Sequence, residues 1–195
     1  MFVFFCGRQR KMLIISTGMK KNNNLVLAIE GHDGSGKTTL AKALAEKIGG
    51  IYIKPFDEDT GLELIKYFEN KQYEQLALFG YQTINKYHDL YANEILVYDR
   101  HWMTVFSLLP ESYWNDKMWY PFPATTLCFA DLEHTLVRLN KRTEKSYEES
   151  YHIYYLELYV RLAKEFDANI LRTDQHDLPA CLAKLTKWYK TSLTV

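Results

Sequence analysis

The chain has 195 residues, of which 47% are hydrophobic and 25% are charged, and its formal net charge is zero. This profile is typical of one globular domain with a proper core, and the balanced charge gives no basic field that would favour a nucleic-acid or membrane partner. The three cysteines, Cys6, Cys128 and Cys181, are odd in number and far apart. That spacing excludes a disulfide framework and compact zinc motifs, and it fits a reducing, cytoplasmic location.

The first 22 residues differ in pattern from the rest. In MFVFFCGRQRK a short apolar run precedes the charges, which is the reverse of a secretory signal peptide, and the run is too short to span a bilayer. The string MKKNNN, which starts at Met19, resembles a natural start placed directly before the first strand. We therefore predict a poorly ordered or misassigned leader over residues 1–22 and a single domain over residues 23–195.

Beyond the leader, short apolar runs alternate with helical patterns. A first strand is predicted from Leu25, before a glycine-rich turn, and four further runs suit buried parallel strands. These runs are Ile51–Ile53, Glu94–Asp99, Thr125–Ala130 and Asn169–Leu171. Helical spacing of apolar residues predicts helices over 37–48, 73–93 and 148–166, and Asp177 can cap a last helix. The alternation predicts a three-layer α/β fold whose ligands lie at the carboxyl ends of the strands.

The turn after the first strand carries a phosphate-binding motif. Residues 31–38 read GHDGSGKT and satisfy G-x-x-x-x-G-K-[ST] in full, between a strand and a helix. Glycines let successive N–H groups curl around a polyphosphate at the positive end of a helix dipole. Lys37 is expected at the β- and γ-phosphates, and the Thr38 hydroxyl on Mg²⁺. The ATP-binding residues predicted on this basis are Gly31, Gly34, Ser35, Gly36, Lys37, Thr38 and Thr39.

A second motif follows the third apolar run. ILVYDRH places Asp99 at the tip of a strand beside the P-loop, where a carboxylate can hold Mg²⁺, and Arg100 directly after it. A helix N-cap is the alternative role for Asp99, and a structural ion pair is the alternative for Arg100. The string most like a guanine-reading N-K-x-D motif, residues 140–143, lacks the aspartate, which argues against a GTPase.

Four segments together resemble the thymidylate kinase and deoxynucleoside kinase superfamily. These are EGHDGSGKTT, YDRH, RLNKRTEKSYEES and ILRTDQHDLPACLAKL, and they span the chain from about Leu25 to its end. The resemblance implies a five-stranded parallel sheet with helices on both faces, a helical lid at about residues 138–150, and ATP as phosphoryl donor with Mg²⁺.

The resemblance also implies roles for single residues. Asp33 would contact the sugar of the acceptor, and Arg100 would orient the acceptor beside the γ-phosphate. Arg138 and Arg142, four residues apart and therefore expected on one helix face, would neutralise charge in the transition state, and Tyr147 would pack on the sugar. A solvated basic face is the alternative for the two arginines, and core packing is the alternative for Tyr147.

The acceptor region departs from the thymidylate kinase pattern. Asp57, Glu58 and Asp59 stand where that family usually has basic residues. They would repel an acceptor phosphate, whereas one of them could serve as general base for a neutral 5′-hydroxyl. LFGYQT resembles a deoxynucleoside kinase stretch that would make Gln82 the base reader and Phe79 a stacking wall. A solvated loop and an ordinary polar helix position are the alternatives for the carboxylates and for Gln82.

The segment from His101 to Pro123 is rich in tryptophan and tyrosine. Core packing is the first interpretation of these aromatic residues, and a base pocket or a homodimer face are the others.

The sequence as a whole predicts phosphoryl transfer from ATP to a deoxynucleoside 5′-monophosphate, as in a thymidylate kinase that converts dTMP to dTDP. Two alternatives stay open. One is a deoxynucleoside kinase acting on a 5′-hydroxyl, and the other is a P-loop protein that binds nucleotide without turnover.

Overall fold

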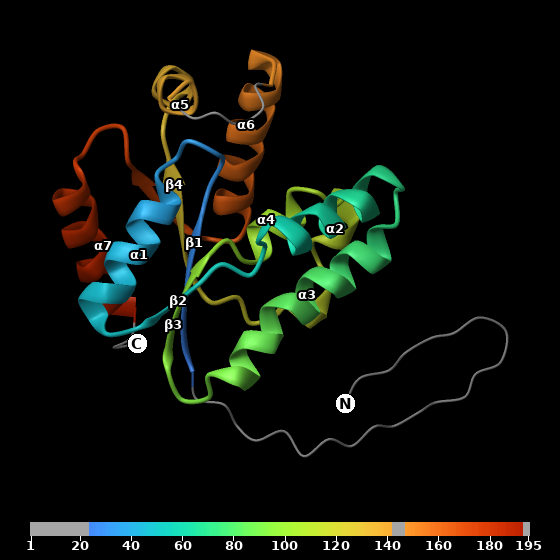
Figure 1. The fold of residues 1–195 in the computed structure, drawn as a ribbon, viewed down its shortest axis with the longest axis horizontal. Coiled ribbons are helices and arrows are strands. Elements are labelled where there is room, and N and C mark those ends of the chain that lie inside the picture. Colours follow the sequence, from blue (N-terminus) through green and yellow to red (C-terminus); the bar gives the residue numbers. More distant parts are fainter. Residues whose placement is uncertain (1–23, 142–146, 193–195) are drawn as a thin grey trace, which may run out of the picture.

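The strands form one parallel sheet. The computed structural model describes residues 24–141 and 147–192, so the predicted leader over 1–22 lies outside the described residues. The sheet has the order β2-β3-β1-β4-β5 (Figure 1). Its strands are β1 Leu25–Glu30, β2 Ile51–Ile53, β3 Ile95–Asp99, β4 Ala124–Phe129 and β5 Asn169–Arg172. The predicted parallel sheet is confirmed, and the strand bounds differ from the predicted ones by no more than about one residue.

Helices cover both faces of the sheet, which confirms the three-layer prediction. α1 (Lys37–Ile48) and α7 (Leu178–Ser192) lie on one face. The other face carries α2 (Glu58–Glu69), α3 (Tyr73–Leu90), α4 (Trp102–Phe106) and α6 (Glu149–Glu165). α5 (Leu132–Leu139) stands beyond the carboxyl end of β4 (Figure 1). Within the described residues, no helix combines the length and apolar character needed to cross a bilayer.

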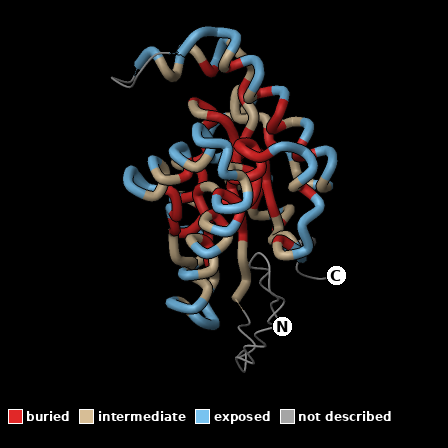
Figure 2. Tube along the Cα trace, turned by 90° about the vertical axis from the view of Figure 1, so that its right-hand side faces the viewer, coloured by how far each residue is buried: buried red, intermediate tan, exposed pale blue. Residues whose placement is uncertain are grey.

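The core has two parts because successive residues of a strand point to opposite faces. Leu27 and Ile29 of β1 pack with Leu40 and Leu44 of α1, and all four are buried. Figure 2 shows the buried sheet at the centre and the exposed outer sides of the helices. Each such side chain contributes about 1.5–3 kcal/mol when fully buried, so the sheet is a rigid base for the loops at its carboxyl edge.

The aromatic segment packs in the core, as first interpreted. Trp102, Trp114 and Trp119 are buried, and the Trp102 ring lies 4.3 Å from that of Phe122, centroid to centroid. The indole N–H of Trp102 donates to Thr125 Oγ1 at 2.9 Å. A homodimer face on this segment stays a prediction.

Two local features concern predicted site residues. The acidic trio opens α2, where Asp57 is the N-cap and accepts from the Thr60 amide at 3.0 Å. Carboxylates in a first helical turn are stabilised by the helix dipole. α5 ends at Leu139 with Asn140 as its C-cap. The expectation that Arg138 and Arg142 share one helix face stays a prediction, because Arg142 lies outside the described residues.

Candidate active site

The P-loop has a backbone that only glycine fits at two places. Gly31 has φ +145°, and a Cβ there would lie 2.4 Å from the carbonyl oxygen of Cys128. Gly34 has φ +78°, and a Cβ there would lie 3.0 Å from the carbonyl oxygen of Thr135. The chain therefore passes close to β4 and α5 before entering α1, whose first N–H groups lack helical partners. This is the geometry of an anion site at a helix N-terminus.

Asp33 connects the two cations of the site. Lys37 Nζ donates to Asp33 Oδ1 at 3.2 Å, and the Arg100 guanidinium pairs with the same oxygen. Burial alone would raise the pKa of Asp33, but Lys37 and Arg100 hold that pKa well below its usual range. Asp33 is therefore ionised at neutral pH.

Arg100 is held in an unusual backbone conformation. Its φ is +82°, in the left-handed region that a side chain with a Cβ rarely adopts. Its N–H donates to the Ile29 carbonyl at 3.0 Å, and its guanidinium donates to Thr104 Oγ1 at 3.4 Å. Such conformations cluster at functional sites, and here the conformation directs Arg100 toward the P-loop.

Glu30, for which no role was predicted, fixes this turn. Its buried carboxylate accepts from the His101 amide at 2.6 Å and from the Thr104 hydroxyl at 2.8 Å. Burial raises the pKa of Glu30, with the bonds from Thr104 and the charge of Arg100 acting against it. A glutamate ending an apolar strand is the signal that could have identified it.

The residues predicted for Mg²⁺ suit that ion. Asp99 Oδ2 accepts from the Tyr52 hydroxyl at 2.9 Å, while Asp99 Oδ1 is buried with no hydrogen-bond partner among the described residues. Thr38 lies half-buried in the first turn of α1, and Ser35 Oγ is a second buried oxygen without a partner in the described chain. An unpaired carboxylate oxygen beside a phosphate site fits a hydrated Mg²⁺.

A cavity of about 410 Å³ opens on one side of the P-loop, and we name it the donor-side cavity because residues predicted to bind ATP line it. Predicted residues Gly34, Gly36, Thr39 and Arg138 line it, together with residues of the β5–α7 loop and α7. The Arg138 guanidinium donates to the carbonyl oxygens of Gly34 at 3.0 Å and Thr173 at 2.7 Å. Arg138 thus joins the P-loop to the β5–α7 loop at the wall of this cavity.

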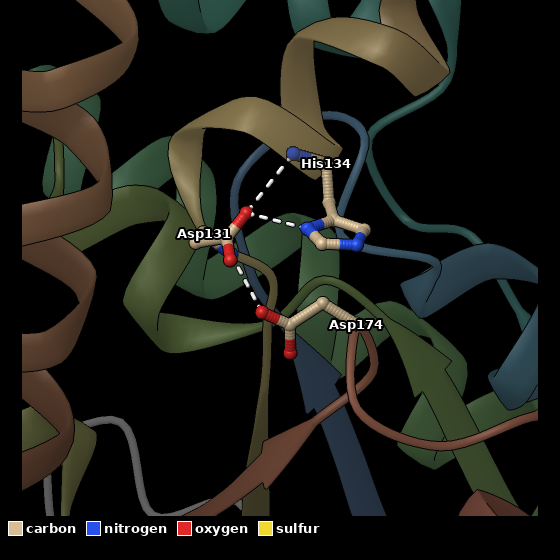
Figure 3. Close-up of side chains that lie close together, drawn as sticks. All are labelled: Asp131, His134 and Asp174. Carbon is tan, nitrogen blue, oxygen red and sulfur yellow. Dashed lines mark hydrogen bonds and ion pairs between the residues drawn. The ribbon is translucent and has the colours of Figure 1, made fainter.

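A polar cluster fastens the same wall (Figure 3). Asp131 is the N-cap of α5 and accepts from the His134 amide at 2.9 Å, and its own amide donates to Asp174 at 3.0 Å. Arg172 pairs with Asp174. The ligand-type atoms of Asp131, His134 and Asp174 lie within 4.8 Å of one another. Because the carboxylates serve the α5 cap and the Arg172 pair, the cluster acts as a clamp between α5 and the β5–α7 loop.

A cavity of about 250 Å³ opens on the other side of the P-loop, and we name it the acceptor-side cavity because Asp33 and Arg100, predicted to contact the acceptor, line it. Asp33 and Arg100 supply the charged side chains among its lining residues. The other lining residues come from the P-loop, α2 and its approach, α4 and its C-cap, and α6. They are His32, Phe56, Gly61, Leu64, Ile65, Thr104, Ser107, Leu108, Tyr151, Tyr155 and Tyr159. The three tyrosines recur at every fourth residue of α6 and therefore share one helix face.

His32 ties the P-loop to α6. Its Nε2 lies 2.8 Å from Nδ1 of His152, and its ring stacks on Tyr155 at a centroid distance of 5.8 Å. Burial, with a contribution from His152, lowers the pKa of His32 to about 4. The His32 imidazole is therefore neutral at physiological pH.

Other predicted residues are not among those that line these cavities. Phe79 packs on Tyr67 with ring centroids 5.7 Å apart, and Gln82 is exposed on α3. Tyr147 is 45% exposed and stacks on Tyr151, which does line the acceptor-side cavity. Asp57, Glu58 and Asp59 are exposed and are not among the residues that line it. Arg142 and part of the predicted lid lie outside the described residues.

The fold has known relatives among solved structures. No protein-family model and no curated protein matches the sequence. Deoxyadenosine kinase from M. mycoides with bound dATP is similar at a TM-score of 0.63 and 16% identity, over 85% of this chain and 99% of that chain. Thymidylate kinase from Candida albicans is similar at a TM-score of 0.63 and 15% identity, over 87% of this chain and 92% of that chain. Shikimate kinase from Acinetobacter baumannii is similar at a TM-score of 0.60 and 16% identity, over 88% of this chain and 96% of that chain.

These similarities define the class of the fold. The chain has the fold of the P-loop kinases, and the resemblance drawn from the sequence is confirmed at this level. Because identities near 16% establish a fold and not an activity, the reaction follows as a proposal.

Proposed function

We propose that this chain transfers the γ-phosphoryl group of ATP to a deoxynucleoside 5′-monophosphate, in the manner of a thymidylate kinase acting on dTMP. The observation that carries this proposal is the pair of cavities on either side of one P-loop. A phosphoryl donor in one and an acceptor in the other would meet at Lys37. Phosphoryl transfer asks a protein chiefly for such positioning and for neutralisation of charge.

On the donor side, the P-loop amides and Lys37 would bind the triphosphate, and the base would enter the cavity beside Arg138 and Thr173. Thr38 and Asp99 would hold Mg²⁺, which when bound neutralises charge on the β- and γ-phosphates. The Asp99 carboxylate is oriented for this task by the Tyr52 hydroxyl.

On the acceptor side, Arg100 would bind the acceptor phosphate, and the ionised Asp33 would accept a hydrogen bond from the sugar. The position of the acidic residues at the start of α2 supports a monophosphate acceptor. The carboxylates of Asp57, Glu58 and Asp59, expected to repel it, are exposed on α2 and its N-cap and are not among the residues that line the cavity.

A nucleoside acceptor is the second candidate, and one observation favours it. Arg100 is the single cationic side chain among the described residues that line the acceptor-side cavity, and Asp33 already pairs with it. A neutral 5′-hydroxyl needs less positive charge than a dianionic phosphate. Asp33 would then orient the hydroxyl, because a carboxylate with so low a pKa is a weak base.

Acceptor-stimulated release of ADP tests the proposal. Thymidine, deoxycytidine, deoxyadenosine and their 5′-monophosphates are each added to enzyme with ATP and Mg²⁺, and Lys37→Ala serves as the inactive control. Turnover of a monophosphate is the expected result. Turnover of nucleosides alone would overturn the monophosphate acceptor and support the nucleoside acceptor. If the chain binds ATP but no acceptor stimulates ADP release, it is a nucleotide-binding protein, and both proposed activities are overturned.

A further inference from the structure

The amino-terminal end of α6 is held by one buried side chain. This end projects beyond the carboxyl edge of the sheet (Figure 1). Of residues 149–155, which form its first two turns, His152 alone is buried, with 5% of its surface exposed. The residues that anchor α6 in the core, among them Leu158, Leu162 and Ala163, lie farther along the helix. The position of this end therefore depends on the contact that His152 makes.

His152 contacts the P-loop through a hydrogen bond between two rings. Its Nδ1 lies 2.8 Å from Nε2 of His32, which is also buried. A neutral imidazole such as that of His32 has one N–H donor and one acceptor nitrogen, so it can pair with a second ring. Because a hydrogen bond is directional, this contact fixes the orientation of α6 relative to the P-loop more narrowly than apolar packing would.

The same end of α6 carries part of the acceptor-side wall. Tyr151, directly before His152, and Tyr155, three residues after it, line the acceptor-side cavity, whereas His152 is not among its lining residues. The ring of Tyr155 is nearly parallel to that of His32, at an interplanar angle of 4°. The Tyr151 ring lies 5.9 Å from the His32 ring, centroid to centroid. The link between the two histidines therefore sets where both tyrosines stand.

The donor-side cavity does not share this dependence. Its lining residues come from the P-loop, α1, α5, the β5–α7 loop and α7, and among the described residues that line it none belongs to α6. His32 is not one of them either. A change at His152 should therefore alter the acceptor-side cavity and leave the donor-side cavity intact.

We propose that His152 is a positioning residue for the acceptor. Through its bond to His32 it holds Tyr151 and Tyr155 at the wall of the acceptor-side cavity, and so sets the affinity for the acceptor without contacting it. This role rests on the proposed phosphoryl transfer. It extends to the acceptor and not to ATP.

Initial rates of ADP release test this role in His152→Leu. The substitution leaves the buried His32 ring without its partner, so KM for the fastest acceptor of the series above should rise about tenfold. KM for ATP and kcat should each change by less than about twofold. A merely structural role would lower the free energy of unfolding and leave both KM values unchanged.

Failure of this role is distinguishable from failure of the proposed function. An acceptor KM in His152→Leu within about twofold of the wild-type value would overturn the role alone. Wild-type enzyme that released no ADP with any acceptor would overturn the proposed function, and the role with it.

Two amide variants form a matched pair. In His152→Asn the amide atoms are bonded to Cγ, as Nδ1 of histidine is, so the bond to His32 can form again. The acceptor KM should then lie within about threefold of the wild-type value. In His152→Gln the amide is one bond farther from the backbone, and the acceptor KM should rise as in His152→Leu. Equal acceptor KM values in the two amide variants would contradict the role, and this comparison decides the question should His152→Leu not fold.

Discussion

The two cavities beside the P-loop are built in different ways. On the donor side, the P-loop and the β5–α7 loop are joined by Arg138, which donates to carbonyl groups of both, and by the Thr173 hydroxyl, which donates to the Ser35 carbonyl at 2.6 Å. On the acceptor side, the walls are side chains from α2, α4 and α6, segments far apart in the sequence. A phosphate chain needs successive N–H groups, which one contiguous motif can supply. A specific acceptor needs shaped side chains, which only the assembled fold brings together.

The largest effect is expected where the two sides meet. Lys37 is buried, contacts Asp33 of the acceptor side and belongs to the donor-side motif. Lys37→Ala should lower kcat by about 10³-fold or more, because charge neutralisation in a dry site is a large catalytic term. ADP release measures this, with circular dichroism to show that the fold is intact. Normal turnover in Lys37→Ala would show that the P-loop lysine takes no part in the reaction.

The P-loop backbone can be strained without replacing any of its functional side chains. Gly31→Ala would place a methyl group against the Cys128 carbonyl at a φ of +145°, and should cost about 3 kcal/mol or more of unfolding free energy. Gly61→Ala is the matched control. No atom lies within 4 Å of a Cβ there, and Gly61 is inside α2, so the change should stabilise by up to about 1 kcal/mol. Urea unfolding of both variants measures the contrast, and equal effects would contradict it.

The acceptor side carries a pH dependence of stability. His32 has its pKa lowered from 6.5 to about 4 by burial, so the unfolded chain binds the proton more tightly than the folded one. Stability is therefore lost as pH falls from about 6.5 to about 4, by about 3 kcal/mol from this group.

The variant His32→Gln isolates that group. It should lose less stability over the same pH interval, because other histidines such as His101 act alike in both proteins. Denaturant unfolding at several pH values gives the difference. Parallel curves for wild type and variant would show that His32 is not the titrating group.

A substitution of Arg100 should affect the acceptor and leave ATP binding nearly unchanged. Arg100→Lys keeps the charge but loses the forked donor that pairs with Asp33. We expect kcat/KM for the acceptor to fall about 100-fold while KM for ATP changes little. Initial rates with each substrate varied in turn measure the two constants. A rise in KM for ATP alone would place Arg100 on the donor side instead.

Arg138 should give the smallest effect, confined to the donor side. Arg138 was predicted to neutralise charge in the transition state, but its guanidinium is engaged by the Gly34 and Thr173 carbonyls. Arg138→Ala removes these bonds and should therefore raise KM for ATP about tenfold with little change in kcat. Arg142→Ala is the comparison, and is predicted to lower turnover more than it weakens ATP binding. A normal rate in Arg142→Ala would refute its assignment to the transition state.

The sequence was most informative where one short segment determines the structure. The strands, the P-loop and the ends of α1 follow from local patterns. Asp33 and Arg100 pair with each other beside Lys37, whereas their roles toward an acceptor stay predictions. The acidic trio was interpreted by charge alone, although Asp57 followed by Thr60 is also a helix N-cap pattern.

The acceptor-side walls could not be predicted, for a physical reason. α6 carries tyrosines at 151, 154, 155 and 159, and spacing alone does not say which ones face the P-loop. The contact between His32 and His152 joins positions 120 residues apart and has no local signal. Phe79 and Gln82 are not among the residues that line the acceptor-side cavity, and Phe79 packs on Tyr67 instead. Their roles as acceptor residues remain predictions.

One binding measurement tests the two-sided site most directly. A compound that joins adenosine to thymidine through a polyphosphate chain should occupy both cavities, so it should bind at least about tenfold more tightly than ATP. That gain should vanish in Arg100→Lys while ATP affinity is kept. Calorimetry that showed no gain over ATP, or the same gain in wild type and variant, would contradict a donor and an acceptor meeting across this P-loop.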